Sequence, residues 1–154
     1  MNKLSKRINN LSESATLAMS RLSRELKQQG KDVISLSLGE PDFNTPDFIK
    51  NSAVQAINDN FSHYTPVPGI LELRKSICKK FYRDNNLEFN ENQIVVSTGA
   101  KQSIANVCLS LLDKGDEVIL LAPYWVSYFE IVKLCGAKPI VVESKIENNF
   151  KSSV

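Results

Sequence analysis

The stretch IVVSTGAKQSIANVCLSLL, residues 94–112, joins two different hydrophobic patterns. The apolar run Ile94 to Val96 is short and continuous, as in a buried strand, whereas apolar residues after Gly99 recur at the three- and four-residue spacing of a helix. The sequence therefore predicts a strand over 94–97, a turn at Gly99 and a helix over 100–112.

The same alternation continues on both sides of this stretch. Downstream, the patterns predict a strand over 117–121, a helix over 127–135 and a strand over 139–142. Upstream, they predict a helix Ala15–Gln29 closed by Gly30, a strand Val33–Leu38, a helix capped at Thr45 and Pro46 that runs to about Ile57, and a helix from Gly69 to near Asn85. Helices between strands act as crossovers, so we expect an α/β fold with a mostly parallel sheet.

The composition is that of one soluble globular domain. The 154 residues are 42% hydrophobic and 23% charged, with a net charge of +2 and no block of like charge, so we expect no nucleic-acid partner. The sequence has no apolar run of membrane-spanning length and no signal-peptide pattern at its beginning, which predicts a cytoplasmic protein without a membrane partner. The three separated cysteines predict buried thiols, without disulfides or a metal site.

The turn at Gly99 has two readings. The first N–H groups of a helix are unpaired and its dipole favours an anion, so this turn can hold a phosphate, with Lys101 beside it. The alternative is an ordinary helix start capped by Ser97 or Thr98. The turn matches neither the P-loop nor the GxGxxG motif.

Two further segments stand where ligands usually bind. Tyr124, Trp125 and Tyr128 follow the strand predicted over 117–121, and an indole at the carboxyl end of a parallel strand can stack on a planar cofactor. Gly39, within SLGEPDF, has a backbone that a substrate can approach. The alternatives are aromatic packing for the first segment and a plain turn for the second.

Four motifs occur together in this order: SLGEPDF, SHYTPVPGILELRKSI, STGAKQS and GDEVILLAPYWVSY. In this combination the chain resembles the N-terminal part of the class I aminotransferases, the pyridoxal-phosphate (PLP) enzymes of fold type I, and bacterial aspartate aminotransferases most of all. The resemblance implies a partial three-layer α/β/α large domain, preceded by a helical segment of the small domain. We expect residues 1–44 to form the arm and small-domain segment and residues 45–154 an incomplete PLP-binding large domain.

The resemblance also implies roles for individual residues. Cofactor-binding roles fall on Gly99, Ala100 and Lys101 at the phosphate, on Trp125 against the pyridine ring, and on Tyr64, which reaches the partner subunit's cofactor phosphate in a homodimer. Substrate-binding roles fall on Gly39 at the α-carboxylate, on Trp125, and on Lys101 at the distal carboxylate of aspartate or glutamate. His63, next to Tyr64, is interpreted as a solvated or packed loop residue.

The family's Schiff-base lysine lies far downstream, so we expect Lys101 not to be that lysine and the chain to contain no catalytic residue. The expectation is an N-terminal fragment, inactive alone, of an enzyme that transfers an amino group between aspartate and a 2-oxo acid such as 2-oxoglutarate. The alternatives are an aromatic, alanine or prephenate aminotransferase, or a noncatalytic remnant that serves as a dimerisation or phosphate-binding module.

Overall fold

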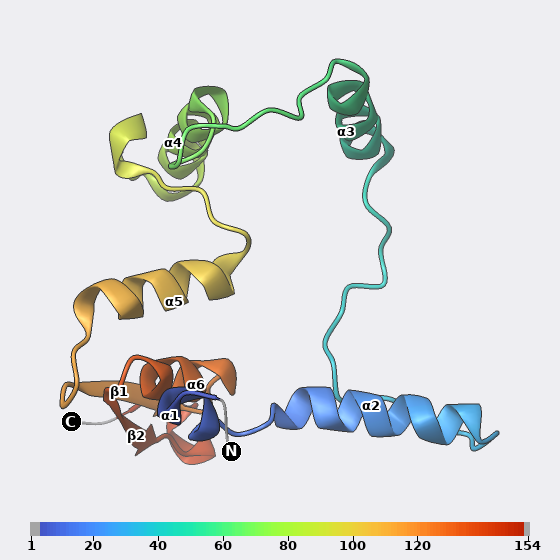
Figure 1. The fold of residues 1–154 in the computed structure, drawn as a ribbon, viewed down its shortest axis with the longest axis vertical. Helices are drawn as coiled ribbons and strands as arrows, with labels where there is room; N and C mark the ends of the chain where they lie inside the picture. Colours follow the sequence, from blue (N-terminus) through green and yellow to red (C-terminus); the bar gives the residue numbers. More distant parts are fainter. Residues whose placement is uncertain (1–3, 153–154) are drawn as a thin grey trace. The chain divides into compact units, whose positions relative to one another are not determined.

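The computed structural model describes residues 4–152, which fall into two compact units. The first unit combines the segments up to Glu40 and from Gly99 onward, and the second is the segment Pro41–Thr98. Figure 1 shows the elements of both units along the chain. Each unit is described by itself below.

A two-stranded parallel sheet is the centre of the first unit. Strands β1 (Glu117–Ala122) and β2 (Lys138–Glu143) pair in register, with Ile119 opposite Ile140. The helix α6 (Ser127–Leu134) connects them and packs on both strands, as Figure 1 shows in orange and red. Val132 of α6 is only 2% exposed and forms the core with Leu120 and Ala137. The predicted parallel α/β arrangement is therefore confirmed.

Three further helices of the first unit surround or precede this core. Helix α5 (Ala100–Leu111) contacts α6, and the short α1 (Lys6–Asn9) contacts α6 as well. Helix α2 (Ala15–Gln28) is capped by the Ser14 side chain and ends before Gly30, whose φ of 79° is left-handed. Glycine adopts this conformation without the steric cost of a Cβ atom, which confirms the predicted end of the helix.

The second unit contains α3 (Asp47–Asn58), α4 (Leu71–Asn85) and the 3-10 turn η1 (Glu91–Gln93). Helix α4 packs against η1. The rings of Phe81 and Phe89 meet edge to face at 5.3 Å, and Ile94, directly after η1, is buried. These contacts fix α4 to the segment that leads towards Gly99 along the chain.

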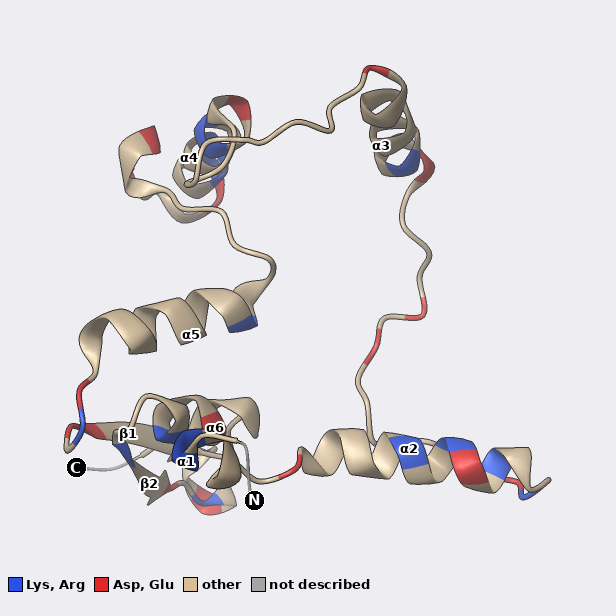
Figure 2. Ribbon diagram, viewed as in Figure 1, with Lys and Arg blue, Asp and Glu red and all other residues tan. Residues whose placement is uncertain are grey.

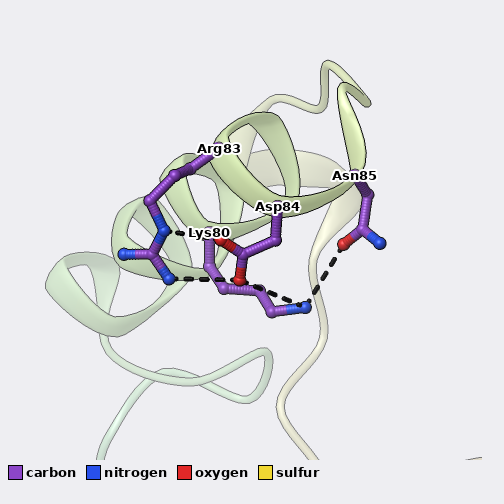
Figure 3. A network of polar contacts seen from close by, with 4 residues as sticks. All are labelled: Lys80, Arg83, Asp84 and Asn85. Atoms are coloured by element: carbon purple, nitrogen blue, oxygen red, sulfur yellow. Dashed lines mark hydrogen bonds and ion pairs between the residues drawn. The ribbon is translucent and has the colours of Figure 1, made fainter.

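A network of exposed polar side chains closes the carboxyl end of α4 (Figure 3). Arg83 donates hydrogen bonds to both carboxylate oxygens of Asp84, at 2.6 and 3.1 Å, and Lys80 donates to Asn85 at 3.2 Å. Asn86 then turns the chain with a left-handed φ of 54°. The hydrogen bond and charge of Arg83 lower the pKa of the Asp84 carboxyl below its ordinary value.

Two predicted strands and one predicted cap are wrong. Residues 33–38 and 94–97 are extended but pair with no strand in the part of the chain that the structure describes. β-prone side chains alone do not make a strand, because a ladder also needs a neighbouring backbone. The Val96 N–H, for example, donates to Pro68 O at 3.0 Å instead. At α3, the N-cap residue is Pro46 and not Thr45, with no side-chain hydrogen bond.

Among residues 4–152, no helix is both long and apolar enough to cross a membrane. The division into an arm with a small-domain segment over 1–44 and a large domain over 45–154 stays a prediction.

Candidate functional site

The turn before α5 leaves free space in front of the helix N-terminus. Gly99 is the N-cap residue, with a left-handed φ of 85°, and as a glycine it has no side chain that could cap the helix. The alternative in which Ser97 or Thr98 is the N-cap residue is therefore wrong. A Cβ atom built on Gly99 meets nothing within 4 Å, so the space in front of the turn is free within its unit.

The first N–H groups of α5 are available to a ligand. Within residues 4–152, the N–H groups of Ala100 and Lys101 donate to no backbone or side-chain acceptor, while Gln102 N–H closes the turn on Gly99 O at 3.1 Å. Unpaired donors at a helix N-terminus, together with the helix dipole, favour a phosphate or carboxylate. This donor set fits an anion.

Lys101 lies against the indole of Trp125. Its Nζ is 5.7 Å from the ring centroid, within the range of a cation–π contact. Trp125 belongs to the turn between β1 and α6 and is 45% exposed. Lys101 is the only charged residue of α5, and Figure 2 shows the rest of that helix in tan. The structure thus brings a cation, a flat aromatic face and free helix donors together within one unit.

A largely apolar groove of about 500 Å³ lies beside these residues. Its walls come from the segment 11–15, from Lys101 and Tyr124, and from the side chains of α6 and the residue before it. Glu130 fastens one wall, because its Oε2 accepts from the N–H of Ser12 at 3.1 Å and Lys133 donates to the same carboxylate at 3.2 Å. The segment 11–15 is therefore held in place by α6.

Sequence reasoning missed Glu130 and the segment it holds. The contact spans 118 residues along the chain, and a single half-buried glutamate on a helix has no local pattern that distinguishes it. Only the fold brings Ser12 to this place.

The structure shows where Gly39 and Tyr64 lie, but no contact of either residue tests its predicted role. Gly39 lies in the first unit, and a Cβ atom built on it meets nothing within 4 Å. Tyr64 lies in the second unit, where its side chain is fully exposed, and His63 is exposed next to it. The roles assigned to Gly39 and Tyr64 stay predictions.

The cysteines match their prediction as thiols. Cys78, Cys108 and Cys135 are free and partly buried. Burial raises the pKa of the Cys135 thiol, with a further contribution from Cys108. Among the described residues, no cluster of His, Cys, Asp or Glu has the geometry to hold a metal ion.

Comparisons with known proteins identify the fold and the family. The sequence profile described as "Aminotransferase class I and II" matches residues 31–154. The aspartate aminotransferase of Bacillus subtilis (strain 168) is 50% identical over 151 residues, which cover 98% of this chain and 38% of that relative. A protein of Rickettsia prowazekii (strain Madrid E), described as a "Probable aspartate/prephenate aminotransferase", is 49% identical over 154 residues, 100% of this chain and 39% of that relative.

Solved structures agree with these relatives. The aspartate aminotransferase from Thermus thermophilus with maleate has a TM-score of 0.95 and 40% sequence identity, over 99% of this chain and 40% of that structure. The chain thus spans well under half the length of the relatives it matches. Its α/β fold is that of the fold type I aminotransferases, as the motifs at Gly39, Gly99 and Trp125 predict. The chain belongs to the class I and II aminotransferase family, whose N-terminal region it matches.

Proposed function

We propose that the protein containing this chain is a PLP-dependent aminotransferase that transfers an amino group between aspartate and a 2-oxo acid such as 2-oxoglutarate. The observation that carries this proposal is the contact of Lys101 with Trp125 beside the unpaired N–H groups of α5. Family membership supplies the class of reaction. The local geometry supports the binding of an anionic, aromatic cofactor.

The residues of the α5 turn fit the phosphate of PLP. The N–H groups of Ala100 and Lys101 would donate to phosphate oxygens, and Gly99, without a Cβ atom, would let the phosphate approach the backbone. The partly exposed indole of Trp125 would pack on the pyridine ring. When bound, PLP supplies an electron sink for the bond broken at the substrate Cα.

Lys101 has a second proposed role, in substrate choice. Its ammonium group lies over the indole and also lines the apolar groove. A cation held beside the ring position would attract the distal carboxylate of aspartate or glutamate. We therefore propose dicarboxylic substrates, and the names of the Bacillus subtilis and Thermus thermophilus relatives support this choice.

The proposal includes a homodimer. Tyr64 is fully exposed and makes no side-chain contact in its own unit, so it is free to reach another subunit. We propose that Tyr64 donates a hydrogen bond to the partner subunit's cofactor phosphate, and that Gly39 presents its backbone to the substrate α-carboxylate. Both roles rest on the motifs that the two residues belong to.

The direct test is a reconstitution of the full-length protein. The apoprotein is titrated with PLP, and amino transfer from aspartate to 2-oxoglutarate is measured by coupled oxaloacetate detection, with phenylalanine, alanine and prephenate as competing partners. We expect cofactor binding at one site per subunit and the highest kcat/KM for aspartate. Binding of PLP without turnover of any amino donor would favour the phosphate-binding module instead.

A further inference from the structure

Arg74, on the first turns of α4, joins two segments that are distant in sequence. Its Nε donates to Gly69 O at 3.1 Å, and its Nη1 donates to Glu91 O at 2.8 Å. The side chain is partly buried. A guanidinium has a planar set of donors, so a single Arg74 side chain fixes the distance between the turn before α4 and η1.

The bonds of Arg74 differ from those of other basic residues on α4. Lys80 and Arg83 pair with Asp84 within the exposed end of the same helix. Arg74 donates to two backbone carbonyl groups, and among the described residues no carboxylate lies within ion-pair distance of it. Such an arrangement fixes main-chain segments rather than neutralising a charge.

The turn that Arg74 holds is also pressed against Val96. Val96 N–H donates to Pro68 O at 3.0 Å, and Gly69 N–H donates to Pro66 O at 2.8 Å. Gly69 has a φ of 100°, and a Cβ atom built there would lie 2.7 Å from Val96 Cγ2. The segment 66–69 is thus held from both sides, and Tyr64 is two residues before it.

We propose that Arg74 is a positioning residue that holds the 64–69 loop so that Tyr64 is presented to the partner subunit. This inference rests on the proposed function, in which Tyr64 reaches the partner's cofactor phosphate. The Tyr64 side chain is fully exposed and does not hold its own backbone in place. The backbone position of Tyr64 is therefore determined by the segment 66–69, which Arg74 and Val96 hold. Loss of the Arg74 bonds would loosen the loop without removing any group that touches the cofactor.

The first test needs no cofactor. Hydrogen–deuterium exchange is measured on the full-length apoprotein for wild type, Arg74→Met and the matched control Arg83→Met. We expect faster exchange at the Gly69 and Val96 amides in Arg74→Met, and wild-type exchange there in Arg83→Met, because Arg83 bonds only Asp84. Unchanged protection in Arg74→Met would overturn the inference whatever the protein binds.

The second test measures the PLP dissociation constant of the same variants. We expect about a tenfold increase for Arg74→Met, partial recovery in Arg74→Lys, which keeps a donor, and no change for Arg83→Met. Phe89→Leu is the stability control, because it weakens the contact with Phe81 but leaves the Arg74 bonds in place. An equal loss of PLP affinity in Phe89→Leu and Arg74→Met would show a merely structural effect and overturn the proposal.

The third test determines which of the two PLP sites in the dimer depends on a given Arg74. Mixed dimers are purified with Arg74→Met on one subunit and Trp125→Ala on the other, using two different affinity tags. If Arg74 acts through Tyr64 on the partner's site, the site of the Arg74→Met subunit is completed by the intact 64–69 loop of the Trp125→Ala subunit. That site then binds PLP with wild-type affinity. Two weakened sites would mean that Arg74 acts within its own subunit, and the inference would fail.

The outcomes for the two proposals are distinct. A wild-type protein that binds no PLP refutes the proposed function and, with it, the role of Tyr64. Wild-type PLP binding together with unchanged exchange and affinity in Arg74→Met refutes only the positioning role.

Discussion

The ammonium group of Lys101, in the first turn of α5, lies 5.7 Å from the centroid of the Trp125 ring. The contact joins two of the four sequence motifs, STGAKQS and GDEVILLAPYWVSY, through side chains. A cation over an indole face is worth about 0.5–1 kcal/mol at an exposed site. The two residues therefore favour one another's position before any ligand is present.

Removal of the indole should weaken cofactor binding. In the full-length protein, Trp125→Ala is expected to weaken PLP binding by roughly 0.5–1.5 kcal/mol beyond the effect of lost contact area. This is the scale of the interaction between aromatic pairs. Equilibrium dialysis of the apoprotein with PLP measures the loss. Trp125→Phe, which keeps a ring, should recover part of it, and unchanged affinity in Trp125→Ala would remove the stacking role.

Loss of the Lys101 charge should change substrate preference. Lys101→Ala is expected to lower kcat/KM for aspartate more than for phenylalanine, because only aspartate has a distal carboxylate to attract. Steady-state kinetics with both donors at saturating 2-oxoglutarate give the ratio. Lys138→Ala is a matched control, since Lys138 pairs with Glu117 on the exposed part of the sheet. Equal losses for the two donors would assign Lys101 to the cofactor or the fold.

A side chain at position 69 should destabilise the protein. Gly69→Ala adds a Cβ atom 2.7 Å from Val96 Cγ2 and keeps a φ of 100°, which costs a residue with a side chain roughly 1–3 kcal/mol. Urea denaturation of the full-length protein measures the change in the free energy of unfolding. Gly39→Ala is the control for stability alone, because its Cβ atom would meet nothing within 4 Å and its φ is not left-handed. Similar stability of both variants would contradict the close contact.

The Asp84 carboxyl should give a small acid-dependent contribution to stability. Its pKa is lowered from the ordinary 3.8, first by the hydrogen bond from Arg83. The contribution is therefore complete above pH 3.8 and is lost as the pH falls through the lower, folded-state pKa. Asp84→Asn should consequently be less stable than wild type at neutral pH, with the difference disappearing in acid. Thermal unfolding monitored from pH 2 to pH 7 measures it, and a difference independent of pH would contradict the assignment.

The 154-residue chain, produced alone, should be aggregation-prone. Ile119 and Leu121 project from the same side of β1 and are both more than half exposed. Within the part of the chain that the structure describes, each strand of the sheet pairs only with the other, so each has one unpaired edge. Unpaired strand edges and exposed apolar faces favour self-association. We expect strong binding of a hydrophobic dye and concentration-dependent light scattering; a soluble monomer with one cooperative thermal transition would contradict this.

Local chemistry determined most of the elements that the sequence predicts well. The helix from Ala15 ends at Gly30 because a left-handed turn is required there, and the helix beginning after Gly99 follows a clear spacing of apolar residues. These signals need no distant partner. Strand pairing depends on a neighbouring backbone, so the β-prone residues 33–38 gave no strand in the described chain.

The candidate site was predictable in its motifs and not in its contacts. The sequence predicts an anion-binding turn at Gly99 and an aromatic face at Trp125, because each belongs to one short segment. The position of Lys101 over that face, the hold of Glu130 on Ser12 and the bonds of Arg74 all join distant segments. Spacing along the chain contains no information about such meetings unless a fold is already known.

The sequence contains a single tryptophan, and it is Trp125. Within these 154 residues, tryptophan emission therefore comes from one place, the turn between β1 and α6, where the ammonium group of Lys101 lies over the ring. Any molecule that enters beside this indole must change the surroundings of the only strong ultraviolet fluorophore in the chain. This part of the protein thus contains an optical reporter at the candidate site, and its emission responds to occupancy without a label.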